Sequence, residues 1–244
     1  MNVGLFIPCY VNQFYPQVAI ATLELLEKLG VEVSYPANQT CCGQPMANSG
    51  FEKTSEQTYN LFIKNFHSYD FIVAPSGSCV YHVRNHLNTI EQTDEVKHVR
   101  NKTYELCEFL VKIIKKEDLK AEFPHRVGLH QSCHGLRGLH LGKSSELIGE
   151  DFSIPGKLLN NVKGIQLVQL DRPDECCGFG GTFAVAEEAV SIKMGNDRIQ
   201  DHIAHNAEVI TATDMSCLMH LKGIIRRRNL SVQVKHIAEI LNSN

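Results

Sequence analysis

The chain has 244 residues, of which 43% are hydrophobic, and a formal net charge of -3 at pH 7. That length can bury one large core or two small ones, and the balance of charge leaves no basic surface for nucleic acid or anionic lipid. No apolar run reaches the roughly 18 residues that cross a bilayer, and the N-terminus carries no positively charged leader. We therefore expect a cytoplasmic protein without a transmembrane segment, whose partners are small molecules or other proteins.

The first half of the chain alternates between patterns typical of strands and of helices. Strands are expected over residues 3–8, 31–35 and 71–74, and helices over residues 15–29, 52–67 and 102–116. Segment 117–125 is charged and contains Pro124, so it is the best linker candidate.

The second half repeats this order after the linker. Strands are expected over residues 126–130, 164–170, 208–212 and 232–235, with a helix over residues 187–205 and a short final helix ending near Leu241. We therefore divide the chain into two domains, residues 1–120 and residues 121–244.

Strands separated by helices predict parallel sheets with crossover connections. The fold class is therefore α/β, with two similar tandem units, each built on a small parallel sheet and related by pseudo-twofold symmetry. Loops after the carboxyl ends of parallel strands meet at one edge of a sheet, which is where open α/β folds place their sites.

Eight of the nine cysteines form two equivalent sets of four, in each of which one cysteine precedes an adjacent pair and one follows it. The intervening segments have 31 and 36 residues in the first set and 42 and 39 in the second. The first set is Cys9, Cys41, Cys42 and Cys79, and the second is Cys133, Cys176, Cys177 and Cys217. Cys107 lies outside both sets, on the apolar side of an expected helix, and is interpreted as a core residue.

This repeated pattern favours metal or cluster binding. Two adjacent cysteines cannot easily join to each other in a disulfide, whereas both thiolates can bind one metal or cluster. Zinc sites usually draw their cysteines from pairs separated by two to four residues, and neither set contains such a pair. Because each expected strand end contributes ligands, an iron–sulfur cluster fits the pattern better than zinc.

Two histidines are further candidates, because each half contains the sequence Ser-Cys-x-x-His, which ends at His82 in the first half and at His220 in the second. On a helix that begins near the cysteine, a residue three positions later can face the same site. Each histidine is therefore a candidate ligand, hydrogen-bond donor to a cluster or proton carrier, or else it packs on the next turn. Four more side chains crowd the second site and are candidates for proton transfer: His130, Ser132, His134 and His140.

These motifs resemble a known family. The pattern Cys-x31-Cys-Cys-Gly-x35-Cys and its looser second copy resemble the duplicated cysteine-rich CCG domain found in heterodisulfide reductases and in the iron–sulfur subunits of glycolate oxidases. The closer resemblance is to the lactate-utilisation protein A family, and it covers nearly the whole chain. It rests on Cys-Cys-Gly-Gln-Pro at 41–45, Pro-Ser-Gly-Ser-Cys at 75–79, Cys-Cys-Gly-Phe-Gly-Gly-Thr-Phe at 176–183 and Thr-Asp-Met-Ser-Cys-Leu at 213–218.

The resemblance implies a subunit of a system that oxidises L-lactate, acting beside a ferredoxin-like iron–sulfur subunit and a third lactate-utilisation protein. In the reductase relatives, the motif cysteines hold [4Fe-4S]-type clusters, some of non-cubane form, and a related domain in some quinone reductases holds zinc. By position, these roles carry over to the eight cysteines of the two sets. The reductase motif ends in Cys-x-x-Cys, and this chain has histidine at 82 and 220 instead, so the type of cluster is left open.

The leading hypothesis is an iron–sulfur redox subunit that relays electrons while lactate is oxidised to pyruvate. One rival is a thiol–disulfide enzyme of the heterodisulfide reductase kind. The other is a zinc-stabilised subunit that assembles its partners. Whether the chain alone is an enzyme is left open at this point.

Overall fold

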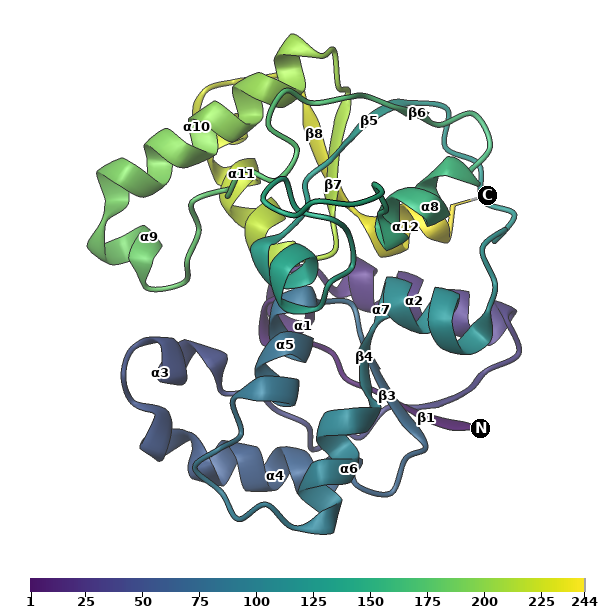
Figure 1. Ribbon diagram of the computed structural model, residues 1–244, viewed down its shortest axis with the longest axis vertical. Helices are drawn as coiled ribbons and strands as arrows, with labels where there is room; N and C mark the ends of the chain where they lie inside the picture. Colours follow the sequence, from purple (N-terminus) through teal and green to yellow (C-terminus); the bar gives the residue numbers. More distant parts are fainter. Residues whose placement is uncertain (244) are drawn as a thin grey trace.

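A computed structural model describes residues 1–243 and contains two α/β units of the same design. In Figure 1 the first half, coloured purple to teal, lies below the second half, coloured teal through green to yellow. Each unit has a four-stranded sheet whose strands are all parallel. The predicted α/β class and the two similar units are therefore confirmed.

The first sheet has the strand order β2-β1-β3-β4. Its strands are β1 Asn2–Leu5, β2 Glu32–Ser34, β3 Phe71–Ala74 and β4 Thr103–Glu105. Helical segments of this half are α1 Cys9–Phe14, α2 Pro16–Lys28, α3 Gln44–Asn48, η1 Glu52–Ser55, α4 Glu56–Phe66, α5 Gly77–Asn85, α6 Asp94–Lys102, α7 Leu106–Phe109 and η2 Leu110–Ile114. The central strands β1 and β3 are buried, as expected for a parallel sheet covered on both faces.

The second sheet has the equivalent order β6-β5-β7-β8. Its strands are β5 Arg126–Leu129, β6 Gln166–Leu167, β7 Val209–Ala212 and β8 Gln233–His236. Helical segments of this half are η3 His134–Gly138, α8 Ile154–Asn160, α9 Phe183–Ala186, α10 Glu188–Ala204, α11 Met215–Arg227 and α12 Ile237–Leu241. The equal strand orders make each strand of one half the counterpart of a strand in the other.

The two halves meet in reciprocal helix pairs. Helix α2 packs on α12 and α7 packs on α8, while α5 packs on η3 and α1 packs on α11. Ser76 and Asp214, which occupy equivalent positions, form an antiparallel backbone bridge between the halves. Exchanging the two halves turns each of these contacts into another of them, as pseudo-twofold symmetry requires. The predicted domain boundary between residues 120 and 121 stays a prediction.

One predicted helix is wrong in its first turn. Residues 103–105, expected within a helix over residues 102–116, form β4, which pairs with β3 through Ile72 and Thr103. The helix begins only at Leu106, where the Glu105 carboxylate accepts hydrogen bonds from the backbone of Cys107 and Glu108. The apolar spacing at residues 106–114 predicted the helix correctly, but it gave no signal for the three-residue strand before it.

Other boundaries differ by smaller amounts. The strand expected over residues 164–170 shrinks to β6, and the one expected over residues 3–8 ends at Leu5. Helix α6 was not predicted, although Thr93 caps its first turn through a hydrogen bond from the Val96 amide. None of the helices in residues 1–243 is long and apolar enough to span a membrane.

Candidate functional site

Both sets of cysteines lie at the carboxyl ends of strands. Cys9 begins α1 just after β1, Cys41 and Cys42 occupy the loop after β2, and Cys79 lies in α5 after β3. The second set repeats these positions: Cys133 lies before η3, the pair 176–177 lies in the loop after β6, and Cys217 lies in α11 after β7. The parallel topology therefore brings together cysteines that are far apart in the sequence.

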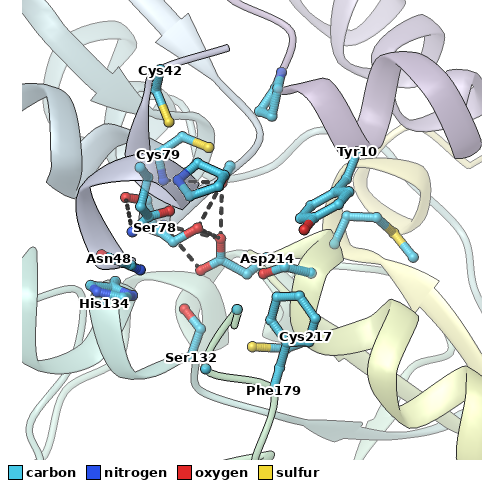
Figure 2. Close-up of a pocket in the computed structure, with 18 of the residues that line it drawn as sticks. Tyr10, Cys42, Asn48, Ser78, Cys79, Ser132, His134, Phe179, Asp214 and Cys217 are labelled. Carbon is cyan, nitrogen blue, oxygen red and sulfur yellow. Dashed lines mark hydrogen bonds between the residues drawn. The ribbon is translucent and has the colours of Figure 1, made fainter. Parts of the chain in front are cut away.

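All eight cysteines of the two sets line a single cavity of about 390 Å³ between the two halves. Figure 2 shows Cys42 and Cys79 on one side of this cavity and Cys217, beside Phe179, on the other. Tyr10 and Phe179 meet edge to face across the two halves, with ring centroids 6.0 Å apart. Cys107 is absent from the lining and is fully buried among core residues. Its interpretation as a core residue is therefore confirmed.

The first set contains one sulfur whose surroundings favour the thiolate. The Sγ atoms of Cys9 and Cys41 lie 3.8 Å apart, and the backbone N–H of Gly43 donates to Cys41 Sγ over 3.4 Å. Hydrogen bonds from Cys42 and Cys9 lower the pKa of Cys41 to about 3. The pKa values of Cys9 and Cys42 are raised, chiefly because each donates to Cys41.

The second set has the same arrangement. The Gly178 N–H donates to Cys176 Sγ over 3.4 Å, and hydrogen bonds from Cys133 and Cys177 lower the pKa of Cys176 to about 2. A hydrogen bond from Cys177 is the main reason that the pKa of Cys217 falls to about 7. In each half, therefore, the surroundings favour the thiolate form of one member of the adjacent pair, and the thiolate is the form that binds metals.

The backbone after each pair explains why glycine follows it. Gly43 and Gly178 have φ angles of 89° and 86°, in the left-handed region that favours glycine. A Cβ atom at Gly43 would lie 2.5 Å from Tyr59 Cε1, and one at Gly178 would lie 2.6 Å from the carbonyl oxygen of Ser191. The Cys-Cys-Gly sequence thus turns the chain sharply and aims the glycine N–H at a sulfur.

The structure places His82 and His220 behind the cysteines rather than in the cavity lining. His82 is buried, and its Nε2 lies 3.1 Å from the Tyr59 hydroxyl. His220 Nε2 lies 3.5 Å from Ser191 Oγ and 3.3 Å from the Ser191 carbonyl oxygen. Burial lowers the pKa of both histidines, that of His82 to about 4. Each ring is thus neutral near pH 7, with its Nε2 next to an oxygen of its own half.

The four additional side chains of the second half separate into different surroundings. Ser132 and His134 line the cavity, whereas His140 is exposed and lies outside the lining. His130 is buried, and one of its ring nitrogens lies within 4.8 Å of the sulfur atoms of Cys177 and Cys217, which are equally close to each other. Only His130 is thus grouped with sulfurs of the second set.

Asp214 is a lining residue that the sequence patterns did not single out. Its carboxylate is 1% exposed and accepts hydrogen bonds from the hydroxyls of Ser76 and Ser78 and from the Ser78 N–H (Figure 2). It therefore fixes the start of α5, and with it Cys79, from the opposite half of the molecule. The sequence signal was available, because Asp214 stands immediately before a helix, where a carboxylate is favoured.

Comparison with known proteins agrees with this geometry. The family model of the CCG cysteine-rich domain matches residues 3–84 and 127–222, ranges that contain the two cysteine sets. Lactate utilization protein A from Geobacillus sp. (strain WCH70) is 39% identical over 247 residues, covering 100% of both chains. The protein of that name from Geobacillus thermodenitrificans (strain NG80-2) is 39% identical over 246 residues, covering 99% of both.

The chain belongs to the Lactate utilization protein A family. As a member of that family, it has one CCG domain match for each α/β unit, and Cys107 lies outside both matches. A crystal structure of a hypothetical protein from Helicobacter pylori shares the fold, with a TM-score of 0.59 and 12% identity, covering 98% of this chain and 48% of that one. The likeness to that structure concerns the fold alone.

Proposed function

We propose that this chain is an iron–sulfur redox subunit of a multi-protein system that oxidises L-lactate to pyruvate in the cytoplasm. The main observation in support is that all eight cysteines of the two sets line one cavity. In this proposal both sets hold [4Fe-4S]-type clusters, cubane or non-cubane, and pass electrons between lactate chemistry and an acceptor. Its partners are a ferredoxin-like iron–sulfur subunit and a third lactate-utilisation protein.

The residues fit such a group. Four cysteines in each half provide the soft sulfur ligands that iron–sulfur clusters take, and Cys41 and Cys176 are already favoured as thiolates. The N–H groups of Gly43 and Gly178 would remain as hydrogen-bond donors to these sulfurs. When bound, an iron–sulfur group supplies one-electron transfer, and hydrogen bonds to its sulfur ligands are among the features that set its reduction potential.

The chain's own residues hold and shield the ligands. Asp214 fixes the helix that carries Cys79, and the Tyr10–Phe179 ring pair covers part of the cavity from both halves. We propose that His82 and His220 act from behind the cysteines, as neutral groups that keep the neighbouring helices in place. Removing a residue that orients a ligand of a metal site typically costs about 10–100-fold in metal affinity or activity.

Oxidation of lactate requires chemistry that the cysteines do not provide. Removing two electrons from a 2-hydroxy acid normally needs a flavin or nicotinamide and a fold that binds it. The sequence has no Gly-x-Gly-x-x-Gly fingerprint after its first strand. We therefore propose that the isolated chain does not oxidise lactate and that a partner performs the two-electron step.

The experiment that tests this proposal is anaerobic pyruvate formation from L-lactate with an artificial electron acceptor. The purified chain alone should give no turnover, and adding the partner proteins should restore it. The double variant Cys176→Ser/Cys177→Ser should fail to restore it under the same conditions. Turnover by the isolated, flavin-free chain would contradict the relay role and identify this chain as the catalytic subunit.

A zinc-stabilised assembly subunit is a second candidate, and one observation favours it. The group formed by His130, Cys177 and Cys217 mixes nitrogen and sulfur donors, which is common at structural zinc sites. Metal analysis of anaerobically purified protein separates the two functions. Iron with acid-labile sulfide supports the redox subunit, whereas zinc without sulfide supports the assembly role.

A further inference from the structure

His130 breaks the symmetry between the two cysteine sets. The sequence Val127-Gly128-Leu129-His130 repeats Val3-Gly4-Leu5-Phe6. The first three residues of each segment lie in β5 or β1, which hold equivalent places in the two sheets, and the fourth residue follows the strand. Val3 pairs with Phe71 in the first half, as Val127 pairs with Val209 in the second. His130 therefore takes the position that Phe6 holds in the first half.

The surroundings of these two residues differ. Phe6 is packed among aromatic rings, with its ring centroid 4.9 Å from that of Phe62 and 5.8 Å from that of Phe66. His130 is 1% exposed, and neither of its ring nitrogens has a partner of normal hydrogen-bond geometry among residues 1–243, although the ring lies close enough to Cys217 to help lower the pKa of that thiol. An unpaired buried polar group costs about 1–3 kcal/mol. A phenylalanine at position 130 would avoid that cost, but His202 of the same half is buried in the same unpaired way, so what distinguishes His130 is the group of atoms beside it.

The position of the ring supplies a reason for the imidazole. One His130 nitrogen, Cys177 Sγ and Cys217 Sγ all lie within 4.8 Å of one another. Zinc binds sulfur at about 2.3 Å and nitrogen at about 2.0–2.1 Å, so a small inward shift of these three atoms would let them share one ion. No first-set cysteine in the described part of the chain belongs to such a three-donor group.

We propose that His130 is a direct nitrogen ligand of the metal or cluster in the second cysteine set. The second set then has a mixed sulfur and nitrogen donor set, whereas the first set has sulfur donors alone. This inference rests on the proposed function in one respect only, namely that the second set binds a metal or cluster. The two sites therefore differ in their donor atoms although their cysteine spacings are alike.

The added ligand changes the number of donors and not the number of thiolates. His130 stands where the first half has Phe6, and both sets keep their four cysteines. The second site thus gains a neutral nitrogen donor that the first site lacks.

The test isolates the second set and uses cobalt(II) as the probe. In the double variant Cys41→Ser/Cys42→Ser, the first set is disabled, and anaerobic Co²⁺ titration reports on the second through its thiolate charge-transfer and ligand-field absorption. Adding His130→Phe should shift the ligand-field bands and weaken cobalt binding by roughly 10-fold or more. The same bands and the same affinity with and without His130 would overturn the proposal.

A matched control is available in the same half. His202 is also fully buried with both ring nitrogens unpartnered among the described residues, but it lies outside the donor group. Its ring lies against Gly128, whose counterpart Gly4 lies against the rings of Tyr69 and Phe66. His202→Phe is therefore expected to leave the cobalt spectrum and affinity unchanged. A loss of binding equal to that of His130→Phe would contradict a specific ligand role.

A second measurement requires no substitution at His130. X-ray absorption of the cobalt-loaded double variant should show a nitrogen shell beside the sulfur shell, and a sulfur-only environment would overturn the proposal. A cooperative urea unfolding transition of the metal-free His130→Phe protein is expected and shows that the variant folds. Failure of the double variant itself to bind cobalt would count against the proposed metal function of the second set, and not against His130 alone.

Discussion

Asp214 in the second half accepts a hydrogen bond of 2.9 Å from the hydroxyl of Ser76 in the first, and these two residues occupy equivalent positions next to the pseudo-twofold axis. The equivalence of position does not extend to chemistry. Ser76 caps its own helix through the Cys79 N–H, whereas Asp214 caps the start of that same helix from the other half. The interface therefore depends on an acid in one half and a pair of hydroxyls in the other.

Asp214→Asn should weaken the junction of the two halves. The substitution replaces a charged acceptor of several hydrogen bonds by an amide that can only partly satisfy the donors of Ser76 and Ser78. We expect a loss of about 1–3 kcal/mol in the free energy of unfolding, measured by urea denaturation. Asp94→Asn is the matched control, because that carboxylate is fully exposed on α6. Equal stability of both variants would show that the inter-half hydrogen bonds contribute nothing.

The stability of the protein should fall between about pH 4.5 and pH 8 because of Glu105. Burial raises the pKa of its carboxyl from 4.5 to about 8. In this window the folded protein therefore binds a proton that the unfolded chain has lost, and folding becomes less favourable as pH rises. Glu105→Gln keeps the oxygen that caps α7 but cannot ionise, so it should be more stable than the wild type at pH 8, by an amount on the order of a few kcal/mol.

Urea denaturation of the metal-free protein across this pH range measures the effect. The difference between the Glu105→Gln variant and the wild type should vanish below about pH 4.5, where both carry a neutral side chain. Glu27→Gln, at an exposed position of α2, is the control and should show no such dependence. A constant difference between the Glu105→Gln variant and the wild type at all pH values would contradict the ionisation of Glu105.

Gly178→Ala should reduce the metal content of the second set. An alanine Cβ would lie 2.6 Å from the Ser191 carbonyl oxygen, at a backbone φ of 86° that alanine rarely adopts. The turn must therefore open, which moves the N–H away from Cys176 Sγ. Gly223→Ala, in the middle of α11 with no atom near the added methyl group, should keep full metal content. Retention of all metal by folded Gly178→Ala protein would show that the turn does not position the site.

Cys107 and Cys177 should respond differently to substitution. Cys107 is fully buried and remote from the cavity lining, so Cys107→Ala should keep its cofactor and lose at most a few kcal/mol of packing free energy. Cys177→Ser should empty the second set, because a serine oxygen is a harder and poorer ligand than sulfur. Equal loss of cofactor in the two variants would mean that the ninth cysteine is also a ligand.

The sequence was sufficient for the architecture because its repeat covers cysteines, strands and helices together. It was insufficient for β4, although the repeat contained the signal for that strand. Glu105-Leu106-Cys107 matches His236-Ile237-Ala238, and residues 232–235 were correctly expected to form a strand before the final helix. A strand of three residues carries too little periodicity to be seen alone, so only the match between halves could have predicted it.

The site was less predictable than the fold. Cysteine spacing showed which thiols belong to each set, but the shared cavity depends on helix packing between the halves, on which local sequence patterns carry no information. His82 was expected near the cysteines from its place in the helix, and the structure turns its Nε2 toward Tyr59 because that hydroxyl satisfies a buried nitrogen. His130 was one of several candidates until burial and its neighbouring sulfurs distinguished it.

The iron and acid-labile sulfide content of the anaerobically purified protein decides whether this chain is an iron–sulfur subunit. The proposed redox subunit should contain iron and sulfide in comparable amounts. The double variants Cys41→Ser/Cys42→Ser and Cys176→Ser/Cys177→Ser should each lose the iron and sulfide that one cysteine set holds. Zinc in place of iron, with no labile sulfide in the wild type, would contradict the assignment of this chain as an iron–sulfur electron carrier.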